Sequence, residues 1–449
     1  MSTDGTDNPV LEVPPSRSRG MLRDNTFRSL KHRNYRLYFF GQIVSFTGSW
    51  MQSAALMWLV YDRTGDPRWP PLMLVAQVGP TVLLGTWGGA LADRWPKRSL
   101  IFLTQSGFLV TASLLTGLAA ADLAEPWLLL AIQLANGTIQ SIDLPARLAF
   151  VPDLVPRADL INAVSLNSLL FNSARAVGPA VTGLVFLLAD AITGAGWLPG
   201  VRPVVAGASL CFGLNAVSFV AVLIALRLIS VPGVGAHKNQ KGSVWDGFRY
   251  VIENPRAGGL LVLTGAICVA GWPALTLFPA YTKLALGLAE KEYSLLVSGL
   301  GGGALVAALT TATFGSVARR GFFLAAGAWL MVAGLAGLAA AGGLDTAVAS
   351  AGCLGFGMIL YLSTGQSALQ LNLPDDKRGR VMALWAMTLS ASAPIGHLMA
   401  GQAATVWPIR EVLAGMAVGA GVIAVGVLTI AVRGWKRAAR PGREATPAE

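Results

Sequence analysis

Residues 89–98 read G-A-L-A-D-R-W-P-K-R, and they stand where an apolar stretch gives way to a short basic one. Gly89 leaves room for a neighbouring helix to approach, and Asp93 places an acid at the end of the apolar stretch. Three basic residues that can pair with this acid follow in the same tight connection: Arg94, Lys97 and Arg98. Flanking positive charge alone would explain these basic residues but not the acid, nor the glycine before it. The segment therefore indicates a specific functional motif at a membrane surface.

The composition of the whole chain indicates an integral membrane protein. The 449 residues are 54% hydrophobic and only 13% charged, with a mean hydropathy of +0.58. One membrane span needs about 20 apolar residues, so the apolar content suffices for about twelve spans joined by short loops. A disordered chain is excluded because disorder requires low hydrophobicity. A soluble nucleic-acid-binding protein is a poor fit, because a net charge of +11 is small beside this apolar content.

Twelve apolar segments recur along the chain, six on each side of a polar connection. Their approximate ranges are 35–61, 71–91, 100–120, 127–150, 163–189, 204–229, 260–281, 293–318, 322–341, 347–371, 381–406 and 412–432. We therefore expect an all-α integral membrane protein of twelve transmembrane helices in two six-helix pseudo-repeats. The expected parts are a disordered cytoplasmic tail (1–34), a first bundle (35–230), a cytoplasmic linker (231–255), a second bundle (256–432) and a cytoplasmic tail (433–449).

The distribution of Lys and Arg predicts the orientation. The two tails and the even-to-odd connections carry 27 of the 34 basic residues, the other connections carry six, and Arg175 alone lies deep inside a segment. Since basic residues accumulate on the cytoplasmic side, both termini are expected in the cytoplasm, with the chain spanning the cell (inner) membrane.

Two pairs of matching segments indicate an internal duplication. The sequence V-P-D at 151–153 returns as L-P-D at 373–375, an offset of 222 residues. G-A-L-A-D-R, which begins at Gly89, returns as G-S-V-A-R-R from Gly315, an offset of 226 residues. Two independent offsets that agree within a few residues are typical of a repeated six-helix unit.

The segment at 89–98 resembles the signature G-x-x-x-D-R-x-x-[RK]-R of the major facilitator superfamily. The resemblance covers about 35–432 and implies two six-helix halves around a central path. In that family the element acts as a latch between the second span and the cytoplasmic end of the eleventh. The resemblance carries this gating role to Gly89, Asp93, Arg94, Lys97 and Arg98. The second copy has Arg319 in place of Asp93, which predicts a one-sided latch.

The fifth segment carries a second motif, A-R-A-V-G-P-A-V-T-G at 174–183. Gly178 and Pro179 favour a kink, and Gly183 continues a face of small residues. The motif resembles the family's antiporter signature, which is seen mainly in exporters, although Ala174 and Thr182 depart from it. A helix-packing face is the alternative interpretation. The stretch 143–163, with P-A-R and V-P-D, resembles the branch that contains the enterobactin exporter and related drug-efflux proteins.

Three ionisable residues inside the apolar segments are candidates for function, since a charge in the bilayer is costly. Arg175 could hold an anionic group of a substrate or pair with Asp143. Asp143 is the leading candidate for a proton carrier. His397 could titrate near neutral pH or could be a packing histidine. For Arg175 and Asp143, a structural tie between helices is the alternative.

The family resemblance also implies which segments line the central path. The polar and aromatic residues on those segments suit a large amphipathic compound that is neutral or weakly charged, although each could instead bridge helices. The candidates are Gln42, Trp50, Gln52, Gln77, Gln133, Asn136, Gln140, Asn167, Asn172, Trp272, Tyr281, Tyr361, Gln366, Gln370 and Trp385.

We therefore expect a secondary transporter that exports an amphipathic small molecule, drug-like or siderophore-like, by alternating access coupled to protons. Import, or flipping of a lipid or lysolipid, is the alternative within the same fold. A membrane enzyme would need a cluster of His, Asp or Cys, which three scattered histidines and three separated cysteines do not supply. No metal, cofactor or nucleic acid is expected. The expected partners of the monomer are the lipid bilayer, the substrate and protons.

Overall fold

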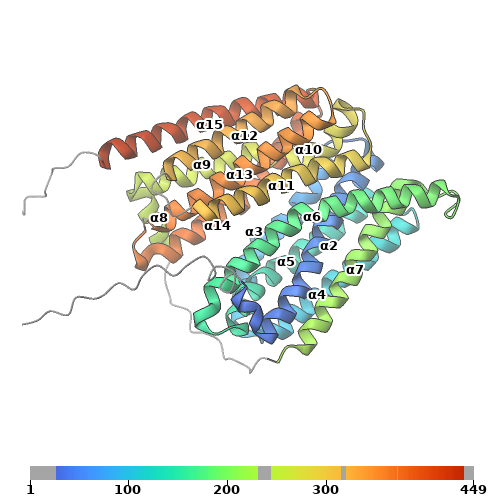
Figure 1. The fold of residues 1–449 in the computed structure, drawn as a ribbon, viewed down its shortest axis with the longest axis horizontal. Helices are drawn as coiled ribbons and strands as arrows, with labels where there is room; N and C mark the ends of the chain where they lie inside the picture. Colours follow the sequence, from blue (N-terminus) through green and yellow to red (C-terminus); the bar gives the residue numbers. More distant parts are fainter. Residues whose placement is uncertain (1–26, 231–243, 315–319, 372, 439–449) are drawn as a thin grey trace, which may run out of the picture.

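The computed structural model describes residues 27–230, 244–314, 320–371 and 373–438 (Figure 1). Within these ranges the chain is helical apart from short connections, and no strand occurs there. Arg319 and most of the expected tails and linker lie outside the described residues.

Each predicted span of the first half corresponds to one helix, and only the span 204–229 extends beyond its helix, by one residue. The helices are α2 (Arg33–Thr64), α3 (Trp69–Arg94), α4 (Lys97–Ala120), α5 (Pro126–Leu154), α6 (Leu160–Gly194) and α7 (Pro203–Leu228), with short 3₁₀ turns η1 (Arg28–Lys31) and η2 (Arg157–Asp159). Most of these helices extend beyond the predicted apolar segments, because their polar ends continue the backbone hydrogen bonding past the apolar stretch.

The second half repeats the pattern with one interruption. Its helices are α8 (Val244–Glu253), α9 (Pro255–Gly271), α10 (Ala274–Ala280), the π-helical turn η3 (Tyr281–Ala285), α11 (Glu290–Phe314), α12 (Arg320–Ala340), α13 (Leu344–Leu371), α14 (Asp375–Ala403) and α15 (Ile409–Ala438). The seventh span consists of α9, α10 and η3, and it is broken at Trp272–Pro273 because proline has no N–H to donate. The short helix α8 precedes it.

In the described chain, eleven helical segments are long and apolar enough to cross a membrane. Helix α5 completes the set of twelve, since it has 29 residues and runs the full length of the first bundle. Its apolar content is lower because polar side chains interrupt it: Gln133, Asn136, Gln140, Asp143 and Arg147. The most polar spanning helix is thus the natural place to look for a site.

Figure 1 shows the two bundles meeting at one end and diverging toward the other. We call the end with the α3–α4 connection and the start of α14 the basic end, and the opposite one the far end. Across the halves, α6 packs on α11 and α3 packs on α14. A Cβ atom at Gly401 of α14 would lie only 2.8 Å from the Pro71 side chain of α3, so these helices touch at the far end.

The side chains on one face of α2 differ in exposure between the two ends of the molecule. Residues three or four positions apart share a helix face, and such a stripe runs along α2 through Phe40, Ile43, Thr47, Trp50, Ala54, Trp58 and Tyr61. Toward the far end, Ala54 and Trp58 are 4% and 3% exposed, because the second half covers them. Toward the basic end, Phe40 and Ile43 on the same face are 55% and 36% exposed. The halves are therefore closed at the far end and open at the basic end.

The hydrophobic clusters follow the same division. The largest cluster joins the halves, with Met51, Trp58 and Tyr61 of α2 packed among residues of α10 and α11. Toward the basic end, the cluster around Phe150 contains residues of the first half only, and the cluster around Trp385 contains residues of the second half only.

Helices α3 and α5 approach closely at two glycines. A Cβ atom at Gly88 would collide with the Ser141 carbonyl oxygen, and one at Gly137 would collide with the Gln77 carbonyl oxygen. The sequence singled out Gly89, but a Cβ atom there meets nothing within 4 Å. Gly88 is thus the packing glycine of this state.

We expect Gly88→Ala to lower the thermal stability of the purified protein, because the added methyl group forces α3 away from α5. Overpacking of this kind costs about 1–3 kcal/mol. The matched control is Gly85→Ala on the same helix, where a Cβ atom has open space. Equal melting temperatures for the two variants would contradict the close approach.

Candidate functional site

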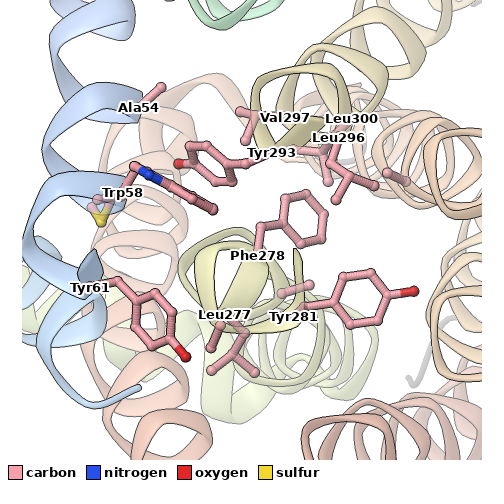
Figure 2. Close-up of a cluster of buried hydrophobic side chains, with 14 of the residues drawn as sticks. Ala54, Trp58, Tyr61, Leu277, Phe278, Tyr281, Tyr293, Leu296, Val297 and Leu300 are labelled. Atoms are coloured by element: carbon pink, nitrogen blue, oxygen red, sulfur yellow. The ribbon is translucent and has the colours of Figure 1, made fainter. Parts of the chain in front are cut away.

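Aromatic side chains of both halves meet at the far end (Figure 2). The rings of Trp58 on α2 and Tyr293 on α11 lie 5.3 Å apart between centroids, and Leu277 and Phe278 of α10 pack beside them. Gly183 of α6 allows a further close contact, since a Cβ atom there would lie 3.0 Å from the Cβ of Ser294. We refer to this set of contacts as the aromatic seam. It closes the far end.

Charged residues border the seam where the helices end. Asp62 accepts from Arg202 of its own half at 3.0 Å and from Lys283 of the other half at 3.3 Å. The Lys283 ammonium also lies 6.0 Å from the centre of the Tyr61 ring. The Asp62–Lys283 pair therefore crosses between the halves, and as a partly exposed pair it contributes about 0–1 kcal/mol.

The first far-end connection has a local ion pair. Arg68 donates from Nε and Nη2 to Asp66, with a shortest distance of 2.7 Å. These hydrogen bonds hold the pKa of the Asp66 carboxyl below its usual range. Asp66 is therefore charged at neutral pH.

The most deeply buried charge lies on α5. Asp143 is 0% exposed and pairs at 2.5 Å with Arg147, one turn away on the same helix. Its Oδ1 atom accepts from Thr104 Oγ1 at 2.6 Å and from Gln105 Nε2 at 2.9 Å, both on α4. Arg147 in turn donates to Gln42 Oε1 of α2 at 2.5 Å. The network joins three helices and compensates both charges.

A neutral network lies farther along α5. Asn136 donates to Gln133 Oε1 at 3.0 Å and accepts from Thr111 of α4 at 2.6 Å. Gln133 lies 3.4 Å from Gln77 of α3. On α2, Gln52 accepts at 2.8 Å from Asn215 of α7. In this state these amides join helices within the first half.

Arg175 of α6 has different surroundings from Arg147. Its guanidinium carbon lies 5.3 Å from the centre of the Trp50 ring, and its Nε atom is buried without a hydrogen-bond partner. The predicted pairing with Asp143 is not formed, because Asp143 is taken by Arg147. Nearby, a Cβ atom at Gly178 would lie 2.5 Å from Trp50 Cβ, so the predicted Gly178–Pro179 step brings α6 onto α2.

The residues of the 89–98 segment divide into two groups. Lys97 pairs with Asp153 at 2.9 Å. Arg98 donates to the carbonyl oxygens of Leu226 at 2.7 Å and Arg227 at 3.0 Å, which satisfies the C-terminal end of α7. Asp93 and Arg94, the other predicted gating residues, are exposed at the end of α3.

The remaining predicted residues are scattered. His397 is 2% exposed, and its Nδ1 lies 2.9 Å from Thr276 Oγ1. Since that hydroxyl also lies 3.0 Å from the Pro273 carbonyl oxygen, the consistent assignment has the hydroxyl donating to Pro273 and His397 Nδ1–H donating to Thr276. Among the other cavity candidates, Tyr281, Tyr361 and Trp385 are buried, Gln140, Asn167, Trp272 and Gln370 are partly buried, Gln366 is exposed, and the side chain of Asn172 lies outside the described residues.

Two functional features were missed at the level of sequence. Arg147 is not among the candidates that the sequence suggested, yet it is buried inside α5. Its four-residue spacing from Asp143 would have indicated the pair, since such residues face each other on a helix. The Asp62–Lys283 pair joins residues 221 positions apart, and no local pattern signals it.

We expect Asp143→Leu to lower thermal stability more than the double variant Asp143→Leu/Arg147→Met. Removing one partner leaves a buried charge uncompensated, at a cost of about 3–5 kcal/mol, whereas replacing both with apolar residues is close to neutral. Melting curves of the purified variants measure the difference. A double variant less stable than the single one would contradict a compensated buried pair.

Comparison with known proteins places this geometry in a family. Residues 24–448 match the model of the transmembrane secretion effector family, a group within the major facilitator superfamily. The chain is 26% identical to the enterobactin exporter EntS of Shigella boydii over 418 residues, which are 89% of this chain and 92% of that protein. It is also 26% identical to the staphyloferrin A transporter of Staphylococcus aureus over 255 residues, 55% of this chain and 59% of that protein.

Solved structures share the fold at low identity. The nucleoside transporter NupG superposes with a TM-score of 0.66 at 13% identity, covering 88% of this chain and 98% of that one. An inward-facing bacterial homologue of the human lysosomal transporter Spinster superposes with a TM-score of 0.65 at 14% identity, covering 91% and 99%. These relatives are membrane transporters and not enzymes. The chain belongs to the transmembrane secretion effector family of the major facilitator superfamily.

Proposed function

We propose that the protein is a secondary transporter that exports an amphipathic small molecule, siderophore-like or drug-like, in exchange for protons. The observation that carries this proposal is the similarity to the enterobactin exporter along nearly the full length of both chains. The fifth-span motif supports the same direction, since it resembles the antiporter signature of exporters.

We place the basic end in the cytoplasm, with both termini there, because along the sequence most of the 34 basic residues fall in the tails and the even-to-odd connections. The described state is then open to the cytoplasm and closed outside by the aromatic seam. An exporter loads its substrate in this state. Transport follows when the two halves, 35–230 and 256–432, rock about a site near the midplane.

The gating segment acts in the opposite, outward-open state. Lys97 and Arg98 are already engaged within the first half, so they fix the connection as part of a rigid unit. Asp93 and Arg94 are presented at the end of α3 and supply the contact to the cytoplasmic end of α14. Gly89, which has open space here, then allows the second half to approach.

Asp143 is the proposed proton carrier, since it is a buried acid in the most polar spanning helix. Protonation removes the charge of Asp143 and weakens its ion pair with Arg147. Because Arg147 also donates a hydrogen bond to Gln42, the change at Asp143 reaches α2. His397 is a weaker candidate because its Nδ1 atom is already hydrogen-bonded to Thr276. The substrate would contact the cavity candidates that are not fully buried in this state, which are Trp50, Gln52, Gln77, Gln140, Asn167, Trp272, Gln366 and Gln370.

Export is tested by the accumulation of fluorescent amphipathic drugs and of siderophores in energised cells that express the protein. We expect lower accumulation than in cells without it, and a protonophore should abolish the difference. Asp143→Asn should remove the pH dependence because the residue can no longer release a proton. Higher accumulation would indicate import, and unchanged accumulation of every compound would reject export.

Two variants should shift the conformation in opposite directions. The reporter is Ala54→Cys in a background without the native cysteines, since Ala54 is 4% exposed in the seam. Lys283→Gln removes the pair across the far end, so labelling by a membrane-impermeant thiol reagent from outside should rise. Asp93→Asn weakens the proposed latch of the other state, so labelling should fall and transport should be lost.

The matched control for the far-end variant is Arg68→Gln, which breaks an ion pair within one connection. Labelling of the Ala54→Cys reporter should stay unchanged in this control. An equal increase in the control and in Lys283→Gln would reject the gating role of the Asp62–Lys283 pair. Normal transport by Asp93→Asn would reject the latch.

A further inference from the structure

Arg175 is a charge inside the bundle that the proposed mechanism does not use. Among the described residues, no carboxylate lies within ion-pair distance of it, whereas the other interior arginine, Arg147, pairs with Asp143. Its Nε atom is buried with no hydrogen-bond partner. Because an uncompensated charge within a membrane protein is costly, this position favours an anion.

One aromatic ring lies against the unpaired guanidinium, and two further rings follow it. Trp50 lies beneath it at 5.3 Å, and the edge of Phe171 approaches Trp50 with the ring centroids 6.0 Å apart. Phe46 continues the series, 5.6 Å from Phe171, and its other neighbour is Arg147 at 4.9 Å. A row of rings thus runs between the two arginines, along the facing sides of α2 and α6.

The row is partly exposed. Trp50 belongs to the α2 stripe, at the position just before the stripe becomes buried at Ala54. Phe171 is 42% exposed. A molecule that enters between the halves from the basic end would therefore reach these rings, with the Arg175 guanidinium beside the innermost of them.

We propose that Arg175, Trp50 and Phe171 form a binding subsite for an aromatic acid group of the transported molecule. The guanidinium donates charge-assisted hydrogen bonds to a carboxylate or phenolate, and the rings stack on the aromatic part of the ligand. This inference rests on the proposed transport function and names the chemical class of its substrate. The alternative is that Arg175 is only a tie between α6 and α2.

The test compares three probes by calorimetry on the purified full chain: 2-naphthoate, its neutral amide 2-naphthamide, and the saturated decahydro-2-naphthoate. We expect the wild type to bind 2-naphthoate about tenfold or more tightly than the amide, as a charge-assisted bond implies. Arg175→Gln should bind the two within about twofold, and Arg175→Lys should keep part of the preference. Trp50→Leu should lose several-fold of the preference for the aromatic over the saturated acid.

Thermal stability separates the two roles of Arg175. A ligand-binding arginine without a partner costs stability, so Arg175→Gln should melt at the same temperature or higher. The control Arg68→Gln, which breaks an ion pair within the first far-end connection, should leave the probe preferences unchanged. A wild type that does not distinguish the acid from the amide overturns the proposal, and so does an Arg175→Gln variant that loses stability but keeps the preference.

The outcome is distinguishable from the outcome of the transport test. If cells export amphipathic compounds but Arg175→Gln does not change the preference for the acid, the subsite is wrong and the transport function stands. If the preference depends on Arg175 while no compound is exported, the subsite stands and the proposed export is rejected.

Discussion

The contact between Trp58 and Tyr293 is one of the contacts that hold the two halves together at the far end, beside the packing of α6 on α11 and of α3 on α14. Between helices in lipid there is no hydrophobic driving force, so association depends on close packing. The aromatic seam supplies that packing at the far end, while the clusters around Phe150 and Trp385 remain separate at the basic end. The exposure of one face of α2 therefore changes along its length, and with it the accessibility of Trp50.

The ion pairs differ in whether they depend on the relative position of the two halves. Asp143 and Arg147 lie on one helix, so their pair does not depend on how the halves are placed and can persist when the halves move. The Asp62–Lys283 pair crosses between the halves and must break when the far end opens. A pair of low strength suits that position, since a strong one would fix the state.

Sequence patterns predicted the spans because apolar length is a local property. They identified the polar residues of α5 but not which partner each one takes. Gly88 and Gly89 are adjacent and chemically identical, so only the direction of the helix face shows that Gly88 meets Ser141. The seam joins residues more than 200 positions apart, and no periodicity within either half contains that information.

The 89–98 segment has a structural role beside its proposed role as a latch. Arg98 satisfies the end of α7, and Lys97 pairs with Asp153 at the end of α5. The connection is therefore fastened to two helices of its own half, so any force on Asp93 or Arg94 is transmitted to the first bundle as a whole. A latch on a loose loop would bend instead of holding the halves. Lys97 and Arg98 are thus more than flanking charge, because they fasten the connection next to Asp93 and Arg94 to the first bundle.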